Sequence, residues 1–493
     1  MNFMPSFYEA QLRHARHFER VLYSAKQLYK QGDEAMQNGL ALFEAEWSNI
    51  RSGQAWAAAH FEQSAEAAQL CSDFPDAGAY VLDMRQPPVE RMVWLKAALT
   101  AAERLQNRGD EGRHLGNLGN AHFDHGEFRQ AIAFYERRLI VAKEIGDRRG
   151  EGRVLGNLGN AHSALSEPHK AIEYYEQALA VARGVGDRRN ESVWLGGLGV
   201  VYKFLGETAK AIQHAEQRLA IARELGDRRS EGIALGNLGL AYDELGESRR
   251  AIELHEQKLV IMREIGDRAR EGIALANLGV AHKNLGEIET ALIYYEQALK
   301  TAREVGDRRV ECACLGNLGN AYCDLGEFQR ALVYHEQALR VSREIGDRRA
   351  EGQDLGNLGF VYAAMGDARE AFIHYEQKLQ IAREIGDRRG EGDVLGKLCL
   401  AYAALYEHEK ALACVEQEFA IVRQIGDQCG EGNAFFHLSV VQAAAGNLAQ
   451  ALSTAEAACQ ILEQIEDPEA LKIQKQLAEW HTQLETITHA QPS

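Results

Sequence analysis

The 493-residue sequence lacks the segments that place a protein in or across a membrane. No stretch reaches the roughly eighteen consecutive apolar residues that a membrane helix needs, and residues 1–20 contain no lysine-flanked apolar core. Basic residues are also in deficit, with 55 against 72 acidic residues and a net charge of −17, so the chain repels a phosphate backbone. We therefore expect a cytoplasmic protein that binds neither membranes nor nucleic acid.

Cysteine and proline are scarce, and no catalytic motif is present. The eight cysteines form no CxxC pair and have no histidine partners at zinc-finger spacing, so we expect reduced packing residues, no metal site and no cofactor. The sequence also lacks HExxH, GxSxG and GxxxxGK[ST], which indicates that the chain is not an enzyme. Seven prolines and no Ser/Gly/Pro-rich linker leave no seam between independent domains, yet 493 residues exceed one compact core. A repeat solenoid satisfies both conditions.

The sequence does contain a repeat with a period of forty residues. The phrase Leu-Gly-Asn-Leu-Gly begins at Leu115, Leu155, Leu235, Leu315 and Leu355, and degenerate copies begin at Leu195, Leu275, Leu395 and Phe435. No insertion shifts the register. The copies predict nine units over residues 111–467, preceded by residues 1–110 and followed by residues 468–493.

Each unit has the pattern of two helices joined by short turns. In the unit 151–190, apolar side chains recur three or four positions apart over residues 155–162 and again over 171–182. The unit ends in Gly186-Asp187, where glycine suits a left-handed helix C-cap and aspartate accepts hydrogen bonds from the first N–H groups of the next helix. A single hairpin cannot bury its apolar face alone, so we expect the hairpins to stack.

This spacing resembles the tetratricopeptide consensus, carried here by Leu155, Leu158-Gly159, His162, Ala171, Tyr175 and Ala178. The forty-residue length and the Leu-Gly-Asn phrase resemble spindle-orientation scaffold proteins and kinesin-light-chain-type repeats. The resemblance implies an all-α, right-handed superhelical solenoid of antiparallel hairpins, whose first helices line a concave groove for a protein or peptide ligand. We also expect Gly159 to let the two helices of its hairpin touch opposite Ala171 and Ala178, with Tyr175 filling the space between neighbouring hairpins.

Both ends of the chain also have helical patterns. Within residues 1–110 we predict helices over residues 7–31, 34–50, 54–71 and 89–106. The stretch ALFEAEWSNIRSGQAWAAAH resembles the segment that joins the ATPase to the repeats in bacterial NB-ARC and MalT-like signalling ATPases. From Pro468 onward we predict a capping helix and a tail.

The expected groove is lined by asparagine. The family's ligand-contacting positions map onto what we call the asparagine ladder, Asn117, Asn157, Asn237, Asn277, Asn317 and Asn357, with further asparagines at Asn120, Asn160 and Asn320. Asparagine both donates and accepts, so the ladder is suited to holding the backbone of an extended peptide. The alternative is that these side chains bond neighbouring helices and set the twist. We expect the neighbouring glycines to leave the groove floor open, namely Gly116, Gly156, Gly236, Gly316 and Gly356.

Charged residues suggest two further features. Arg113 and Arg153 precede the first two ladder positions and favour an acidic partner at that end. The arginine pairs that follow each Gly-Asp are expected to bind nearby glutamates on the surface. The leading hypothesis is a non-catalytic scaffold that binds a partner polypeptide. The alternative is a regulatory sensor for a separate ATPase or protease effector in bacterial signalling or defence.

Overall fold

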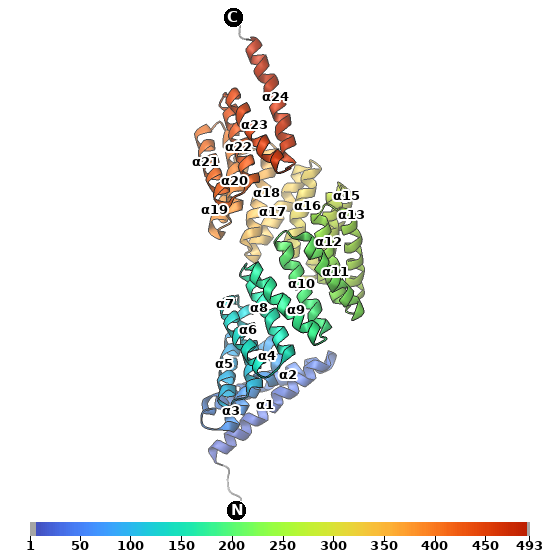
Figure 1. The fold of residues 1–493 in the computed structure, drawn as a ribbon, viewed down its shortest axis with the longest axis vertical. Coiled ribbons are helices and arrows are strands. Elements are labelled where there is room, and N and C mark those ends of the chain that lie inside the picture. The colour runs from blue at the N-terminus through green and yellow to red at the C-terminus, as the bar shows by residue number, and fades with distance from the viewer. Residues whose placement is uncertain (1–5, 491–493) are drawn as a thin grey trace, which may run out of the picture. The chain divides into compact units, whose positions relative to one another are not determined.

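The computed structural model describes residues 6–490, and within that range the regular structure consists of helices without strands (Figure 1). Residues 1–5 of the predicted N-terminal region and residues 491–493 of the predicted C-terminal tail lie outside the described residues. Contacts divide the chain into two compact units, residues 1–241 and 242–493, which we describe separately. The predicted boundaries at residues 110 and 467 follow the repeat pattern and stay a prediction.

The first unit begins with a helical bundle that precedes the repeats. Its helices are α1 (Phe7–Gln31), α2 (Asp33–His60), α3 (Ala65–Ala77), α4 (Ala79–Arg85) and α5 (Pro88–Arg104). Their core is rich in aromatic residues, including the buried Phe43, Phe74 and Trp94. The predicted bounds of α1 are confirmed, and α5 begins one residue before its predicted start because Pro88 occupies the first helical turn.

The prediction of two helices over residues 34–50 and 54–71 is wrong. A single helix, α2, runs through Gly53, and a Cβ at that position would lie 3.2 Å from the Cα of Ala15 in α1. Gly53 therefore allows two helix backbones to approach closely and does not end a helix. The break comes later, where the Ser64 hydroxyl accepts hydrogen bonds from the N–H groups of Glu66 and Ala67 and starts α3.

Hairpins follow in both units, on the predicted forty-residue period. In the first unit the helices are α6 (Arg108–Asp124), α7 (Phe128–Glu144), α8 (Arg148–Ala164), α9 (Pro168–Gly184), α10 (Arg188–Phe204), α11 (Thr208–Glu224) and the start of α12 (Arg228–Glu244). In the second unit they are α13 (Ser248–Glu264), α14 (Arg268–Asn284), α15 (Ile288–Val305), α16 (Arg308–Asp324), α17 (Phe328–Ile345), α18 (Arg348–Ala364), α19 (Ala368–Ile385), α20 (Arg388–Ala404), α21 (His408–Ile425), α22 (Gln428–Ala444), α23 (Leu448–Gln464) and α24 (Glu469–Ala490). The all-α repeat solenoid is confirmed.

The Gly-Asp pair between repeats has the predicted caps. Gly306 ends α15 in the left-handed conformation, with φ of 72°. The side chain of Asp307 then accepts a hydrogen bond from the N–H of Val310, 3.1 Å away, and starts α16. The same arrangement recurs along both units, so two adjacent residues fix where one repeat ends and the next begins.

A glycine on the first helix meets a ring on the second helix within each of several hairpins. A Cβ at Gly159 would lie 2.7 Å from Cδ1 of Tyr175, and a Cβ at Gly279 would lie 2.5 Å from Cε1 of Tyr295. Tyr175 also lies against Gly197 of the following hairpin. The predicted place of Tyr175 between neighbouring hairpins is confirmed, and Gly159 accommodates this ring and not the predicted Ala171 and Ala178.

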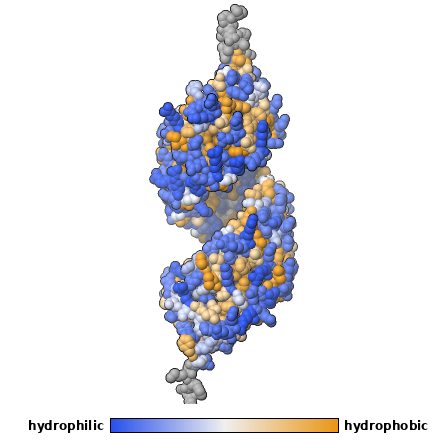
Figure 2. Space-filling model, turned by 90° about the vertical axis from the view of Figure 1, so that its left-hand side faces the viewer, coloured by the Kyte–Doolittle hydropathy of each residue, from blue (hydrophilic) through white to orange (hydrophobic). Residues whose placement is uncertain are grey.

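Arginine and glutamate form a second periodic set of contacts. Glu191 is buried and binds Nε of Arg183 at 2.8 Å and Nη1 of Arg188 at 2.5 Å. The other end of Arg188 reaches Glu224, thirty-six residues later. The pattern recurs in the second unit, where Arg308 binds Glu311 and Glu344. The expected pairing with glutamate is confirmed for the first arginine of each pair, although the glutamate three residues later is buried and does not lie on the surface. Hydrophilic side chains predominate on the face drawn in Figure 2.

The helix α24 covers the apolar surface of α23. Ala470, Ile473 and Trp480 of α24 are buried in one cluster with Leu462 of α23. The predicted C-terminal capping helix is therefore present. Within the described residues, no helix is both long enough and apolar enough to cross a bilayer.

Candidate functional site

In the first unit, Asn157 of the ladder and the further asparagines Asn120 and Asn160 form hydrogen bonds between helices. Oδ1 of Asn120 accepts a hydrogen bond from the hydroxyl of Tyr135 at 2.8 Å and another from Nδ2 of Asn157 at 3.2 Å. Oδ1 of Asn160 likewise accepts from Tyr175 at 2.6 Å. Asn120 and Asn160 are nevertheless exposed, and their carbonyl oxygens face the protein. Their N–H groups are therefore the part of each amide that is available to a ligand.

Three other ladder asparagines, Asn117, Asn237 and Asn277, also lie on first helices. Asn117 and Asn237 are half-buried on α6 and α12, and Asn277 is half-buried on α14. Nδ2 of Asn277 is buried and has no hydrogen-bond partner among the described residues. A buried amide without a partner costs free energy, so packing alone does not account for this group.

The two arginines expected to attract an acidic partner have different surroundings. Arg113 binds Asp76 of α3, with Nη1 and Oδ2 3.2 Å apart, and also binds Asp110. Its charge is thus partly neutralised by contacts with the bundle. Arg153 is exposed on α8 near Arg138. Burial, reinforced by the charge of Arg153, lowers the pKa of Arg138.

The expectation of an open groove floor is wrong at three glycines. A Cβ at Gly116 would collide with the guanidinium of Arg138, and one at Gly156 would collide with the ring of Trp194. At Gly356 it would lie 3.0 Å from Cδ of Lys378. Long side chains of neighbouring helices fill these spaces, so glycine serves packing there.

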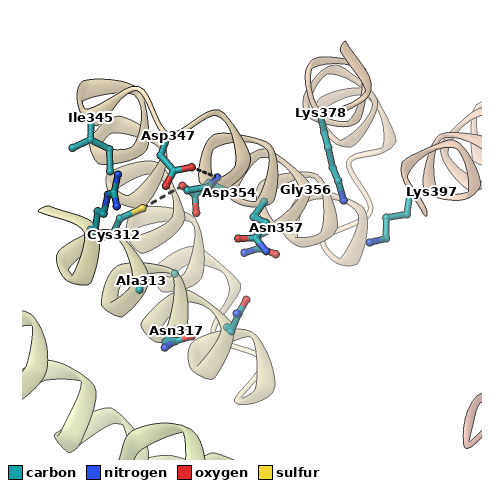
Figure 3. A pocket seen from close by; sticks show the side chains of 15 residues that line it. Cys312, Ala313, Asn317, Ile345, Asp347, Asp354, Gly356, Asn357, Lys378 and Lys397 are labelled. Carbon is teal, nitrogen blue, oxygen red and sulfur yellow. Dashed lines mark hydrogen bonds between the residues drawn. The ribbon is translucent and has the colours of Figure 1, made fainter. Parts of the chain in front are cut away.

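Gly316 is different, and a pocket forms beside it. The only side-chain atom near a Cβ at Gly316 is Oδ1 of Asp354, at 3.9 Å, within the described residues. Lys378, which lies over Gly356, has Ala338 as its equivalent in the preceding repeat. The short side chain of Ala338 does not cover the floor of the groove at Gly316. The resulting pocket measures about 480 Å³ and is lined by three predicted residues, Asn317, Asn320 and Asn357 (Figure 3).

Asp354 forms one end of the pocket and was not among the residues predicted for the site. Its side chain lies on α18 and is 5% exposed. Oδ2 accepts a hydrogen bond from the hydroxyl of Ser342 at 2.9 Å, and the thiol of Cys312 lies 3.8 Å from the same oxygen. Burial raises the pKa of Asp354 to about 6. The sequence does contain a signal for this residue, because Asp354 occupies the repeat position that holds valine in two other units, at Val154 and Val394.

Two lysines approach the pocket from the other side (Figure 3). Nζ of Lys378 and Nζ of Lys397 lie 2.9 Å and 3.1 Å from Oδ2 of Asp393. Burial would raise the pKa of Asp393, but the two lysines hold it below its ordinary value. The pocket therefore has a buried carboxylate at one end, two lysines at the other and amide groups between them.

Comparisons with known proteins agree with this architecture. Tetratricopeptide repeat models match residues 115–149 and, in overlapping windows, residues 150–384. A model of anaphase-promoting complex subunit 5 matches residues 398–486. A search of curated proteins found no match.

Several solved structures have a similar fold. A signal transduction ATPase with numerous domains and a tetratricopeptide repeat sensor, from Pyrococcus horikoshii, is 15% identical and covers 86% of this chain and 67% of its own, with a TM-score of 0.55. The quorum sensor NprR from B. thuringiensis is 17% identical over 73% of this chain and 99% of its own, with a TM-score of 0.49. Kinesin-light-chain-like repeats from Podosopora anserina are 20% identical over 40% of this chain and 96% of their own, with a TM-score of 0.35.

The tetratricopeptide models together span residues 115–384, more than half of the chain, and coincide with the stacked hairpins. The chain therefore belongs to the tetratricopeptide repeat family.

Proposed function

We propose that this protein is a non-catalytic scaffold that binds an extended segment of a partner protein along the first helices of its repeats. The observation that carries the proposal is the pocket beside Gly316, where asparagines from two successive first helices, α16 and α18, line one space. Amide groups at this spacing are suited to pairing with the backbone of an extended chain.

The energetics of the ladder are sufficient for a ligand of modest affinity. One hydrogen bond contributes about 0.5–1.5 kcal/mol net, and micromolar binding requires about 8 kcal/mol. Six ladder positions would supply about 9 kcal/mol at the upper end of the range, and lower in the range additional contacts in the pocket would supply the rest. Asn157 contributes less, because its Nδ2 already binds Asn120.

Removing four ladder amides tests the proposal. In the variant Asn157→Ala, Asn237→Ala, Asn277→Ala and Asn317→Ala, the Kd for peptides selected on the immobilised wild-type chain should rise at least about tenfold, a loss of about 1.4 kcal/mol. Fluorescence anisotropy measures the Kd, and circular dichroism checks the helical content. The matched control removes four exposed amides from second helices, Gln177, Gln257, Gln297 and Gln377, and should leave the Kd unchanged. Equal affinity of the wild type and the folded ladder variant would refute the proposal.

A second candidate is a sensor arm for a separate ATPase or protease effector. The likeness to the Pyrococcus horikoshii protein covers 86% of the chain and so includes helices that precede the repeats. On one of these, α5, Val89 and Val93 lie one turn apart and are 68% and 59% exposed. Such a pair of apolar side chains is a candidate contact for an effector.

The two candidates predict different results for the double variant Val89→Asp and Val93→Asp. A sensor arm should lose its effector in affinity capture followed by mass spectrometry, because two carboxylates would enter an apolar contact. Binding of groove-selected peptides should remain as in the wild type. Capture of the same proteins by the wild type and the variant would argue against the sensor function.

A further inference from the structure

Burying the carboxylate of Asp354 costs free energy, and the packing of the repeat does not require a carboxylate at this position. The corresponding residue of most other repeats is apolar, as at Val154, Trp194 and Val394, and each of these is buried; the polar exception is His114, which bonds Ser72. A buried carboxylate loses several kcal/mol of hydration unless hydrogen bonds or a cation compensate. Ser342 and Cys312 both approach Oδ2. Neither group bonds Oδ1, which is the carboxylate oxygen beside Gly316.

Oδ1 faces the open side of the pocket. It is the atom found 3.9 Å from a Cβ placed at Gly316, across the space that Ala338 leaves unfilled. At Gly116 and Gly356 the corresponding space is occupied by cationic side chains of this chain itself, Arg138 and Lys378. A cationic side chain over the glycine thus recurs in this repeat. Among the described residues, no cationic atom lies within 4 Å of a Cβ placed at Gly316, although Arg309 lines the same pocket.

We propose that Asp354 receives a lysine or arginine side chain of the partner segment, so that the groove selects a basic residue at this position. The inference rests on the proposed function. The ammonium or guanidinium would bind Oδ1, and the flanking backbone would lie along Asn317 and Asn357. Lys378 and Lys397 repel a cation at the opposite end, although Asp393 partly neutralises them. This asymmetry places the basic residue at the Asp354 end.

Selection from a randomised library of acetylated and amidated twelve-residue peptides tests the inference, because blocked ends exclude capture of a terminal amine. On the full-length wild type, lysine or arginine should be enriched at one position of the aligned peptides. On Asp354→Asn that enrichment should disappear, and the Kd of a selected peptide should rise at least about tenfold. Replacing the selected lysine by norleucine should raise the Kd for the wild type by the same factor and leave the Kd for Asp354→Asn unchanged. Glu336→Gln, which removes an exposed carboxylate from α17 outside the pocket, should behave as the wild type.

The pH dependence gives a second readout. Protonation of Asp354 removes the charge that the cation binds, so the Kd should rise by up to about tenfold between pH 7.5 and pH 5, and should stay flat in Asp354→Asn. Because burial raises the pKa of Asp354 to about 6, this change falls within that range. The other charged or titratable groups around it are Arg309, Cys312, Asp347, Glu351, Lys378 and Lys397. A further variant, Asp354→Val, introduces the residue that two other repeats have at this position, Val154 and Val394. It should fold and should no longer prefer peptides with a basic residue.

The outcomes separate this inference from the proposed function. Selected peptides without a basic residue, or an unchanged preference in Asp354→Asn, would overturn the role of Asp354 and leave the scaffold function standing. Failure of the wild type to select any peptide would overturn both.

Discussion

Replacing Tyr295 by alanine is expected to lower the free energy of unfolding by about 3–5 kcal/mol. The side chain is 1% exposed, and it lies in one buried cluster with Leu278 and Leu315 of the flanking first helices. Its ring rests on Gly279, so helices α14 and α15 cannot close the cavity without moving their backbones. Each hairpin of a solenoid is stabilised by its neighbours, so the loss should be concentrated near this repeat.

Urea unfolding followed by circular dichroism measures the change, and hydrogen exchange should show faster exchange in α14, α15 and α16 than elsewhere. The matched control is Ile293→Ala on the same helix, whose side chain is 57% exposed and whose loss should change stability by less than about 0.5 kcal/mol. Equal urea midpoints for the two variants would contradict the role assigned to the ring.

The second large effect is expected from Glu271→Gln. Glu271 is 4% exposed and binds Nε of Arg263 at 2.8 Å and the guanidinium of Arg268. Burial would raise its pKa, but the hydrogen bonds and charges of the two arginines outweigh burial and lower the pKa below its ordinary value. Because both arginines are about half exposed, we expect a loss at pH 7 of about 2–3 kcal/mol, below the range for a fully buried pair.

The sign of the pH dependence follows from the lowered pKa. The folded state holds Glu271 ionised more strongly than the unfolded state does, so its stabilisation is complete above the unfolded pKa and is lost as the pH falls through the folded pKa. The wild type should therefore lose stability more steeply than Glu271→Gln below about pH 4.5. Urea midpoints measured from pH 7 to pH 3 test this, with the exposed Glu256→Gln as control. Parallel curves for all three proteins would rule out the contribution of the buried ion pair.

Local patterns in the sequence were sufficient to predict the repeats. Helix periodicity, together with caps such as Gly306 and Asp307, depends on residues close in the chain, so hairpins and turns could be predicted without coordinates. Gly53 shows the limit of this approach. Glycine ends a helix or brings two helices together, and only the neighbouring backbone, here Ala15, distinguishes the two roles.

The site was less predictable because its shape depends on residues from different repeats. The sequence places Asn317, Asn320 and Asn357 on first helices, and the structure brings them to one pocket. Whether a glycine leaves space depends on the residues twenty-two and thirty-eight positions later. Arg138 fills the space at Gly116 and Trp194 fills it at Gly156, whereas Ala338 and Asp354 leave it open at Gly316. The hydrogen bond between Tyr135 and Asn120 is a contact of the same kind, which periodicity alone does not reveal.

The links between arginine and glutamate bear on how such a chain can change in length. Arg188 pairs with Glu191 and Glu224, and Glu191 also binds Arg183, so these links span three, eight or thirty-six residues. Duplicating or deleting a block of forty residues keeps the buried glutamates opposite arginines, whereas a change of another length leaves them opposite other side chains. Genetic recombination between copies can therefore lengthen or shorten the protein in whole repeats without redesigning a single interface.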